Sequence, residues 1–124
     1  MFHRFESQEE RRAFGGSAFI EIQYCRRPKG TAAEEIVSAD SIKNWEDDSL
    51  YVTDGDMNEF FDQYAAVLGW KTGMKLFAVS YYSCEQTAEI MEAVTRLKPI
   101  GYEVLTDWLA QAKERYNGFC ILGI

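Results

Sequence analysis

Alternation of apolar and polar positions predicts four β-strands. In residues 17–25, the even positions from Ala18 to Tyr24 lie on one face, and Glu21 and Gln23 lie on the other. This period of two is typical of a strand with one face in the core. The further predicted strands are Leu50–Thr53, Met74–Tyr82, which is apolar enough to be central, and Phe119–Leu122.

A period of 3.6 residues predicts one helix in the middle of the chain. Apolar residues from Met57 to Leu68 recur at the spacing of a single helical face, and Gly69 ends the pattern. Asp56 has the position of an N-cap, and Glu59 three residues later would complete a capping box.

Two further helices are predicted in the C-terminal third. Ser83 and Gln86 form a second capping-box pattern, which opens a helix to about Leu97. The next helix runs from Glu103 to about Tyr116. Its predicted inward side chains are Leu105, Trp108, Leu109 and Ala112.

The remaining segments have weaker patterns. Phe2–Phe14 is compatible with a short helix or an ordered arm. Glu34–Ala39 is compatible with a short strand, and Asp40–Glu46 with a helical turn. The order of elements predicts an α+β fold, a small and mostly antiparallel sheet with about three helices packed on it.

Composition supports a single globular domain over residues 1–124. The chain is 47% hydrophobic and 15% aromatic, which is sufficient for a core. The longest uncharged stretches are Leu76–Cys84 and Tyr116–Ile124, about half the roughly 20 residues that a membrane helix needs. The charged N-terminal segment lacks the apolar region of a secretory signal. We therefore expect a cytoplasmic protein with no membrane partner.

The net charge of −7 comes from one segment. Between Glu34 and Asp62 only Lys43 opposes the acidic residues, whereas basic residues slightly outnumber acidic ones elsewhere. Such a segment repels nucleic acid and anionic membranes and attracts a cationic protein. An acidic surface that only maintains solubility is the alternative. The acidic residues are Glu34, Glu35, Asp40, Glu46, Asp47, Asp48, Asp54, Asp56, Glu59 and Asp62.

Aromatic residues within this segment favour a binding role, because aromatic side chains inside a charged rim are typical interface anchors. They are Trp45, Tyr51, Phe60 and Phe61. The candidate partner-binding residues are Trp45, Glu46, Asp47, Asp48, Tyr51, Asp54, Asp56, Glu59 and Asp62.

Patterns for metal and nucleophile chemistry are absent from the sequence. Cys25, Cys84 and Cys120 have no C-x-x-C spacing, and His3 is the single histidine. A zinc site or a His-dependent nucleophile is therefore not expected. We interpret the three cysteines as inert thiols, and Cys84 at a helix start is the one whose thiolate the helix dipole could favour.

Other binding motifs also fail. Asp54–Asn58 resembles the start of a calcium loop, but Glu59 occupies the required glycine position and Ala65 that of the bidentate acid. No glycine-rich phosphate loop is present. Arg26–Gly30 resembles a small phosphate-contact patch, but a solvated turn is favoured because no aromatic residues adjoin it in sequence. We expect no catalytic residue, metal or cofactor.

The C-terminal third is similar to small immunity proteins of bacterial contact-dependent growth-inhibition and polymorphic-toxin systems. The residues that carry the resemblance are Tyr81-Tyr82-Ser83-Cys84-Glu85-Gln86-Thr87, Lys98-Pro99, Tyr102-Glu103-Val104-Leu105, Trp108-Leu109 and Tyr116-Asn117-Gly118-Phe119. The resemblance covers about 40 residues. It implies a small cytoplasmic protein that blocks a cognate toxin domain, commonly a basic nuclease, without doing chemistry itself.

Three functions therefore stand as hypotheses. The first is a non-catalytic inhibitor that neutralises a cationic protein toxin through its acidic segment. The second is another acidic inhibitor or nucleic-acid mimic, of the anti-defence kind. The third is a small ligand-binding domain or enzyme, in which Trp70, Tyr81 and Tyr82 would frame an aromatic pocket.

Overall fold

Four antiparallel strands form one sheet in the computed structural model, which describes residues 1–15, 18–38, 42, 45–69 and 79–123. The strands are β1 (Phe19–Tyr24), β2 (Leu50–Thr53), β3 (Val79–Tyr82) and β4 (Phe119–Leu122). Their order is β2-β1-β4-β3, so the last strand in sequence lies inside the sheet. In register, Glu21 pairs with Tyr51 of β2 and with Leu122 of β4.

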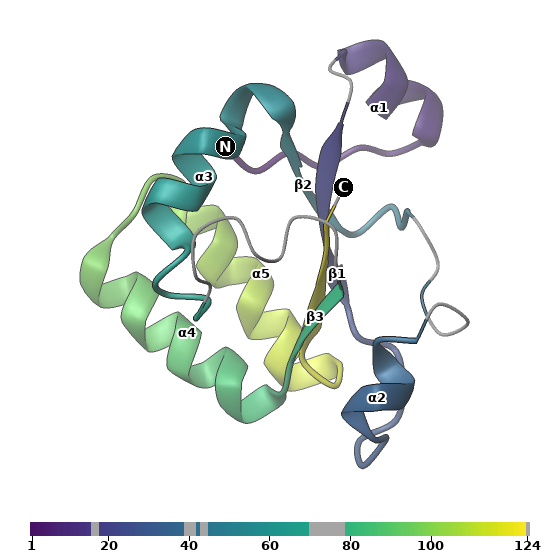
Figure 1. Ribbon diagram of the computed structural model, residues 1–124, viewed down its shortest axis with the longest axis vertical. Helices are drawn as coiled ribbons and strands as arrows, with labels where there is room; N and C mark the ends of the chain where they lie inside the picture. The colour runs from purple at the N-terminus through teal and green to yellow at the C-terminus, as the bar shows by residue number, and fades with distance from the viewer. Residues whose placement is uncertain (16–17, 39–41, 43–44, 70–78, 124) are drawn as a thin grey trace.

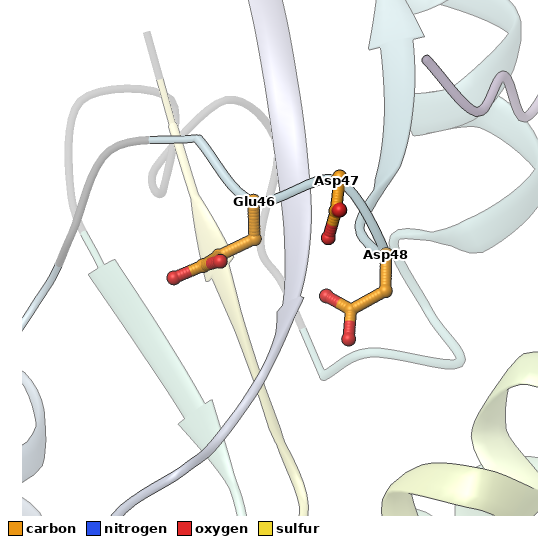
Figure 2. Close-up of side chains that lie close together, drawn as sticks. All are labelled: Glu46, Asp47 and Asp48. Carbon is orange, nitrogen blue, oxygen red and sulfur yellow. The ribbon is translucent and has the colours of Figure 1, made fainter. Parts of the chain in front are cut away.

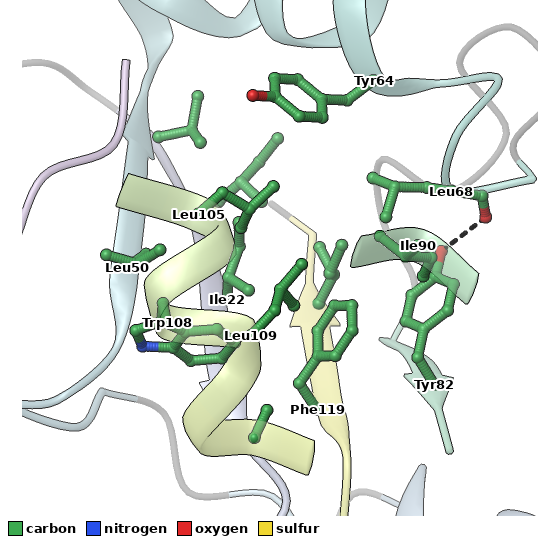
Figure 3. Close-up of a cluster of buried hydrophobic side chains, with 14 of the residues drawn as sticks. Ile22, Leu50, Tyr64, Leu68, Tyr82, Ile90, Leu105, Trp108, Leu109 and Phe119 are labelled. Carbon is green, nitrogen blue, oxygen red and sulfur yellow. Dashed lines mark hydrogen bonds between the residues drawn. The ribbon is translucent and has the colours of Figure 1, made fainter. Parts of the chain in front are cut away.

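The main core lies on one face of this sheet. Strand alternation directs Ile20, Ile22 and Tyr24 of β1 to that face, as predicted, and β2 and β4 add their own apolar side chains. Three helices cover it: α3 (Met57–Tyr64), α4 (Cys84–Leu97) and α5 (Tyr102–Arg115) (Figure 1). Figure 3 shows Trp108 and Leu109 of α5 facing Ile22 and Phe119 across this core.

The opposite face of the sheet has a lighter cover. Helix α1 (Gln8–Phe14) and helix α2 (Ala33–Ile36) lie on that side (Figure 1). Cys25, Cys120 and Leu122 pack there against Ile36 of α2 in a second, smaller apolar cluster. The described residues thus form an α+β fold with five α-helices, more than the three expected, because the two short helices α1 and α2 are added.

Local sequence explains the helix boundaries of α4 and α5. Ser83 accepts from the Gln86 N–H and the Gln86 side chain accepts from the Ser83 N–H, so the predicted capping box is confirmed. Lys98 ends α4 in a left-handed conformation. Gly118 then has φ +77°, and a Cβ there would lie 2.0 Å from the Tyr82 carbonyl oxygen. Only glycine permits β4 to begin so close to β3.

Several predictions about the first two-thirds of the chain are wrong. Asp56 makes no side-chain cap, because a 3-10 turn, η1 (Asp54–Asp56), leads directly into α3 and the Asp56 carboxylate lies 3.5 Å from His3 Nε2. The helix also ends earlier, at Tyr64. Helix α2 occupies part of the strand predicted at Glu34–Ala39.

The predicted strand at Met74–Tyr82 is described only from Val79 onwards, and there it pairs with β4 at the sheet edge rather than centrally. Most of the helical turn predicted at Asp40–Glu46 lies outside the described residues, and Trp45 and Glu46 at its end are not helical. Trp70 of the proposed aromatic pocket also lies outside the described residues. None of the helices in the described ranges combines the length and hydropathy needed to cross a bilayer.

Candidate functional site

Residues Trp45–Ser49, here called the acidic loop, enter β2 and carry three consecutive carboxylates. The loop lies over the lightly covered face of the sheet. On that face the Glu21 side chain of β1 points away from the main core and towards the loop. The Glu21 side chain is 6% exposed. A carboxylate so deeply buried needs several donors to replace its lost hydration.

The donors come from the acidic loop itself. The Trp45 N–H donates to Glu21 Oε1 at 2.8 Å. The Glu46 N–H and the Ser49 hydroxyl donate to Oε2 at 2.9 and 2.7 Å. The Tyr51 hydroxyl, 3.3 Å from Oε2, donates to the Glu46 carbonyl oxygen at 2.8 Å. One buried carboxylate therefore holds the backbone at the start of the loop and the Ser49 side chain at its end.

Trp45 shows what this arrangement costs locally. Its φ of +79° lies in the left-handed region, which disfavours residues with a Cβ by roughly 1–2 kcal/mol. In that conformation its N–H points at Glu21. The charge-assisted hydrogen bond, of a kind that contributes about 1.5–3 kcal/mol, offsets the strain.

Asp48 is held by a closed circuit of side chains. Its carboxylate pairs with the Arg26 guanidinium, which lies 5.3 Å over the Tyr116 ring. Tyr116 stacks on Tyr24, and Tyr24 stacks on Trp108 at 4.0 Å between centroids. Trp108 Nε1 then donates to the Asp48 carbonyl oxygen at 2.8 Å, which closes the circuit. The loop is thereby tied to α5 as well as to β1.

The three carboxylates of the acidic loop lie close together. One oxygen from each of Glu46, Asp47 and Asp48 lies within 4.8 Å of the others. Figure 2 shows the three side chains projecting from consecutive positions of the loop. Asp47 is exposed, and Glu46 and Asp48 are partly exposed. The spacing suits a cationic group, and Arg26 already supplies one beside Asp48.

The other acidic candidates lie at the far end of β2, on η1 and α3. Asp54, Glu59 and Asp62 are exposed, and Asp56 lies near the Met1 amino group and His3. Four strand residues rise about 13 Å, so the two groups of acids are separated by more than the Debye length of about 8 Å at physiological salt. The acidic candidate residues thus form two groups, one in the acidic loop and one on η1 and α3.

The aromatic candidates are mostly internal. Tyr51 is 0% exposed and Phe60 belongs to the main core, so neither can be an exposed anchor. Burial, and then the neighbouring Glu21 charge, raise the pKa of Tyr51 well above its ordinary value of 10. Trp45 is partly buried, and its Nε1 has no hydrogen-bond partner among the described residues. Trp45 remains a candidate aromatic contact, whereas Phe61 is also partly buried but packs against the main core.

Tyr81 and Tyr82 of the proposed aromatic pocket both line one cavity, although their hydroxyl groups are engaged elsewhere. Tyr82 lies in the core and donates to the Leu68 carbonyl oxygen at 2.8 Å, whereas Tyr81 lies on the other face and donates to the Asn117 carbonyl oxygen at 2.9 Å. A cavity of about 670 Å³ adjoins them, but Glu34 is the one acidic residue among its described lining. The paired carboxylates that would favour an enzyme are not found in this lining.

Two of the three cysteines are buried, as expected of inert thiols, and Cys84 is partly exposed. Cys25 and Cys120 are buried neighbours, and a hydrogen bond from Cys120 lowers the pKa of Cys25 to about 7. Cys84 opens α4, where its Sγ lies 3.4 Å from the Tyr116 carbonyl oxygen, which it can donate to.

Three residues that organise the acidic loop, Glu21, Arg26 and Trp108, were not predicted to do so. A charged residue inside a predicted strand was the available signal for Glu21. Comparison of the chain with protein-family models, with curated protein sequences and with solved structures finds no match.

Proposed function

We propose that this protein is a non-catalytic inhibitor of the immunity-protein type, which neutralises a cationic protein toxin by docking its acidic loop on it. The observation that carries the proposal is that the buried Glu21 holds the loop from which three neighbouring carboxylates project. A loop ordered before binding loses little conformational entropy on association, which favours tight complexes.

The second acidic group would contribute in another way. Asp54, Glu59 and Asp62 are exposed, and no salt bridge within the described residues involves Glu59 or Asp62. Charges at the rim of an interface mainly accelerate encounter, and salt weakens this effect. A standard interface buries about 1,600 Å², so a partner that covers the acidic loop would also contact neighbouring surface.

The test is co-expression with the C-terminal domain of whatever protein is encoded immediately upstream, scored by growth rescue and co-purification. Association rates of purified proteins then compare two double variants with the same charge change. These are Glu46→Lys/Asp47→Lys in the acidic loop and Glu59→Lys/Asp62→Lys on α3. Asp48 is left unchanged because its pairing with Arg26 belongs to the fold.

We expect the loop variant to weaken the complex by at least about tenfold, mostly through faster dissociation, and the α3 variant to change mainly the association rate. Equal effects of the two variants would show that only total charge matters and would overturn the docking role of the loop. A toxic domain that is neither rescued nor bound would overturn the proposed function itself. Competition by nucleic acid for the same partner would favour the mimic.

A further inference from the structure

A second charged site, here called the basic pocket, lies between the loop after β1 and the C-terminal end of α5. Its volume is about 250 Å³. Two segments almost 90 residues apart in sequence supply its walls, and four of the side chains are cationic. The lining residues that bear on binding are Arg26, Arg27, Lys29, Glu114, Arg115 and Asn117.

Hydrogen bonds hold the two walls of the basic pocket together. The Asn117 side chain donates to the Pro28 carbonyl oxygen at 3.2 Å, and the Asn117 N–H donates to the Cys25 carbonyl oxygen at 3.1 Å. The Thr31 hydroxyl donates to the same Pro28 oxygen at 2.7 Å. The loop is therefore fixed against α5, and the cations need little reorganisation to meet a ligand.

The cations differ in how far they are already neutralised. Arg26 pairs with Asp48, and Arg27 lies 3.6 Å from Glu35, both acids outside the basic pocket. For Lys29 and Arg115 no salt bridge lies within 4 Å in the described part of the chain. These two side chains, one from each wall, keep their full charge for an anion.

We propose that the basic pocket binds the phosphate group of a small phosphorylated molecule. Guanidinium groups present paired donors that match phosphate oxygens, and lysine adds a compact charge. A phosphate dianion gains more from several converging cations than a single carboxylate does. Acids beyond about 8 Å are screened at physiological salt, so the main opposition comes from Glu114 in the lining and from Asp48 and Glu35 beside its arginines.

The sequence favoured a solvated turn at Arg26–Gly30, since no aromatic residues adjoin it. The structure brings Arg115 and Tyr116 beside it, and Tyr116 orients the Arg26 guanidinium from 5.3 Å. The carbonyl end of α5 is also near and carries partial negative charge. We therefore expect modest affinity, with a Kd of about 1 mM for inorganic phosphate.

The test follows backbone amide NMR shifts during titration with inorganic phosphate and, separately, with AMP, at about 0.15 M salt. The variant Lys29→Gln/Arg115→Gln removes the two unpaired cations. Its matched control is Lys113→Gln/Arg96→Gln, in which an exposed lysine of α5 and an exposed arginine of α4 lie outside the pocket lining. Dispersed spectra of both variants would verify their folds.

We expect saturable amide shifts at Arg26, Arg27, Lys29 and residues 115–117. The Kd should rise at least about tenfold in the pocket variant and less than about twofold in the control. Tighter binding of AMP than of phosphate would assign a nucleotide, and equal binding a phosphate monoester or free phosphate. Absence of saturation, or equal weakening in both variants, would overturn the proposal. The measurement needs no toxin, so its outcome is independent of the proposed function.

Discussion

Two groups of carboxylates flank β2, and the fold supports them differently. In the acidic loop, the Trp45 N–H donates to Glu21, the Asp48 carboxylate pairs with Arg26 and the Asp48 carbonyl oxygen accepts from Trp108. Glu59 and Asp62 instead project from the exposed side of α3, whose other side packs in the core. Acids of the same sequence segment are thus fixed in one place and freely solvated in the other.

The difference shows that charge density and charge placement are separate properties. Solvated acids on a helix change the field around the molecule, and their exact positions matter little. The acidic loop keeps three carboxylates close despite their repulsion, and beneath them lies a fourth carboxylate, Glu21, paired with N–H and O–H donors. Such an arrangement depends on the fold and can be broken by single substitutions.

The largest effect is expected from Glu21→Gln. The amide has one acceptor oxygen where the carboxylate has two. The Trp45 N–H, the Glu46 N–H and the Ser49 hydroxyl therefore cannot all keep an acceptor. Unsatisfied buried donors and the lost charge-assisted bonds predict a destabilisation of about 2–4 kcal/mol. Urea unfolding followed by tryptophan fluorescence would measure it.

The matched control for that variant is Glu59→Gln, which removes one carboxylate from the solvated group. We expect it to change the unfolding free energy by less than about 0.5 kcal/mol. Similar destabilisation by both changes would contradict the claim that the fold supports the acidic loop and leaves the acids of α3 solvated.

An intermediate effect is expected from Tyr51→Phe, which removes the donor to the Glu46 carbonyl oxygen. The predicted cost near neutral pH is about 1–2 kcal/mol. Because the pKa of Tyr51 is raised in the folded state, its contribution is complete below pH 10 and is lost as the pH rises above 10. Tyr24, whose pKa burial raises to about 12, adds to the same alkaline loss.

Unfolding free energies measured from about pH 8 to about pH 11 would separate these contributions. The wild-type protein should lose stability above pH 10 more steeply than the Tyr51→Phe variant. Parallel curves for the two proteins would contradict the burial of the Tyr51 hydroxyl against Glu21.

The smallest effect is expected from Arg26→Gln. The Arg26–Asp48 pair is partly exposed, with side-chain exposures of 39% and 27%, so its contribution is discounted to about 0.5–1 kcal/mol, including the contact with Tyr116. Raising the salt concentration should reduce the difference between variant and wild type. A salt-independent difference would mean that the ion pair is not its source.

Sequence patterns predicted the elements that periodicity determines. The face of β1 that carries Ile20 and Ile22, the capping box at Ser83 and the inward residues of α5 are confirmed. Failures fell where a tertiary contact decides the structure, as at Asp56, whose carboxylate turns to His3 instead of capping α3.

The sequence predicted the negative charge of the candidate site but not the tertiary contacts that hold it. Glu46, Asp47 and Asp48 are adjacent in sequence, so their proximity follows from the chain itself. The burial of Tyr51 depends on an aromatic cover from the N-terminal segment, where Phe5 lies 5.4 Å from its ring. The support by Glu21 depends on a contact across 24 residues, and no local pattern encodes such a contact.

The position of β4 has a consequence for how the molecule is made. A ribosome completes β1, β2 and β3 before it adds residues 119–122, yet β4 is the strand that joins β1 to β3. Until that strand emerges, the nascent chain can form at most the β1–β2 hairpin, and its apolar faces stay open to chaperones or to aggregation. The sheet therefore closes only after residues 119–122 have been synthesised, and the acidic loop reaches its final form after α5 has been translated.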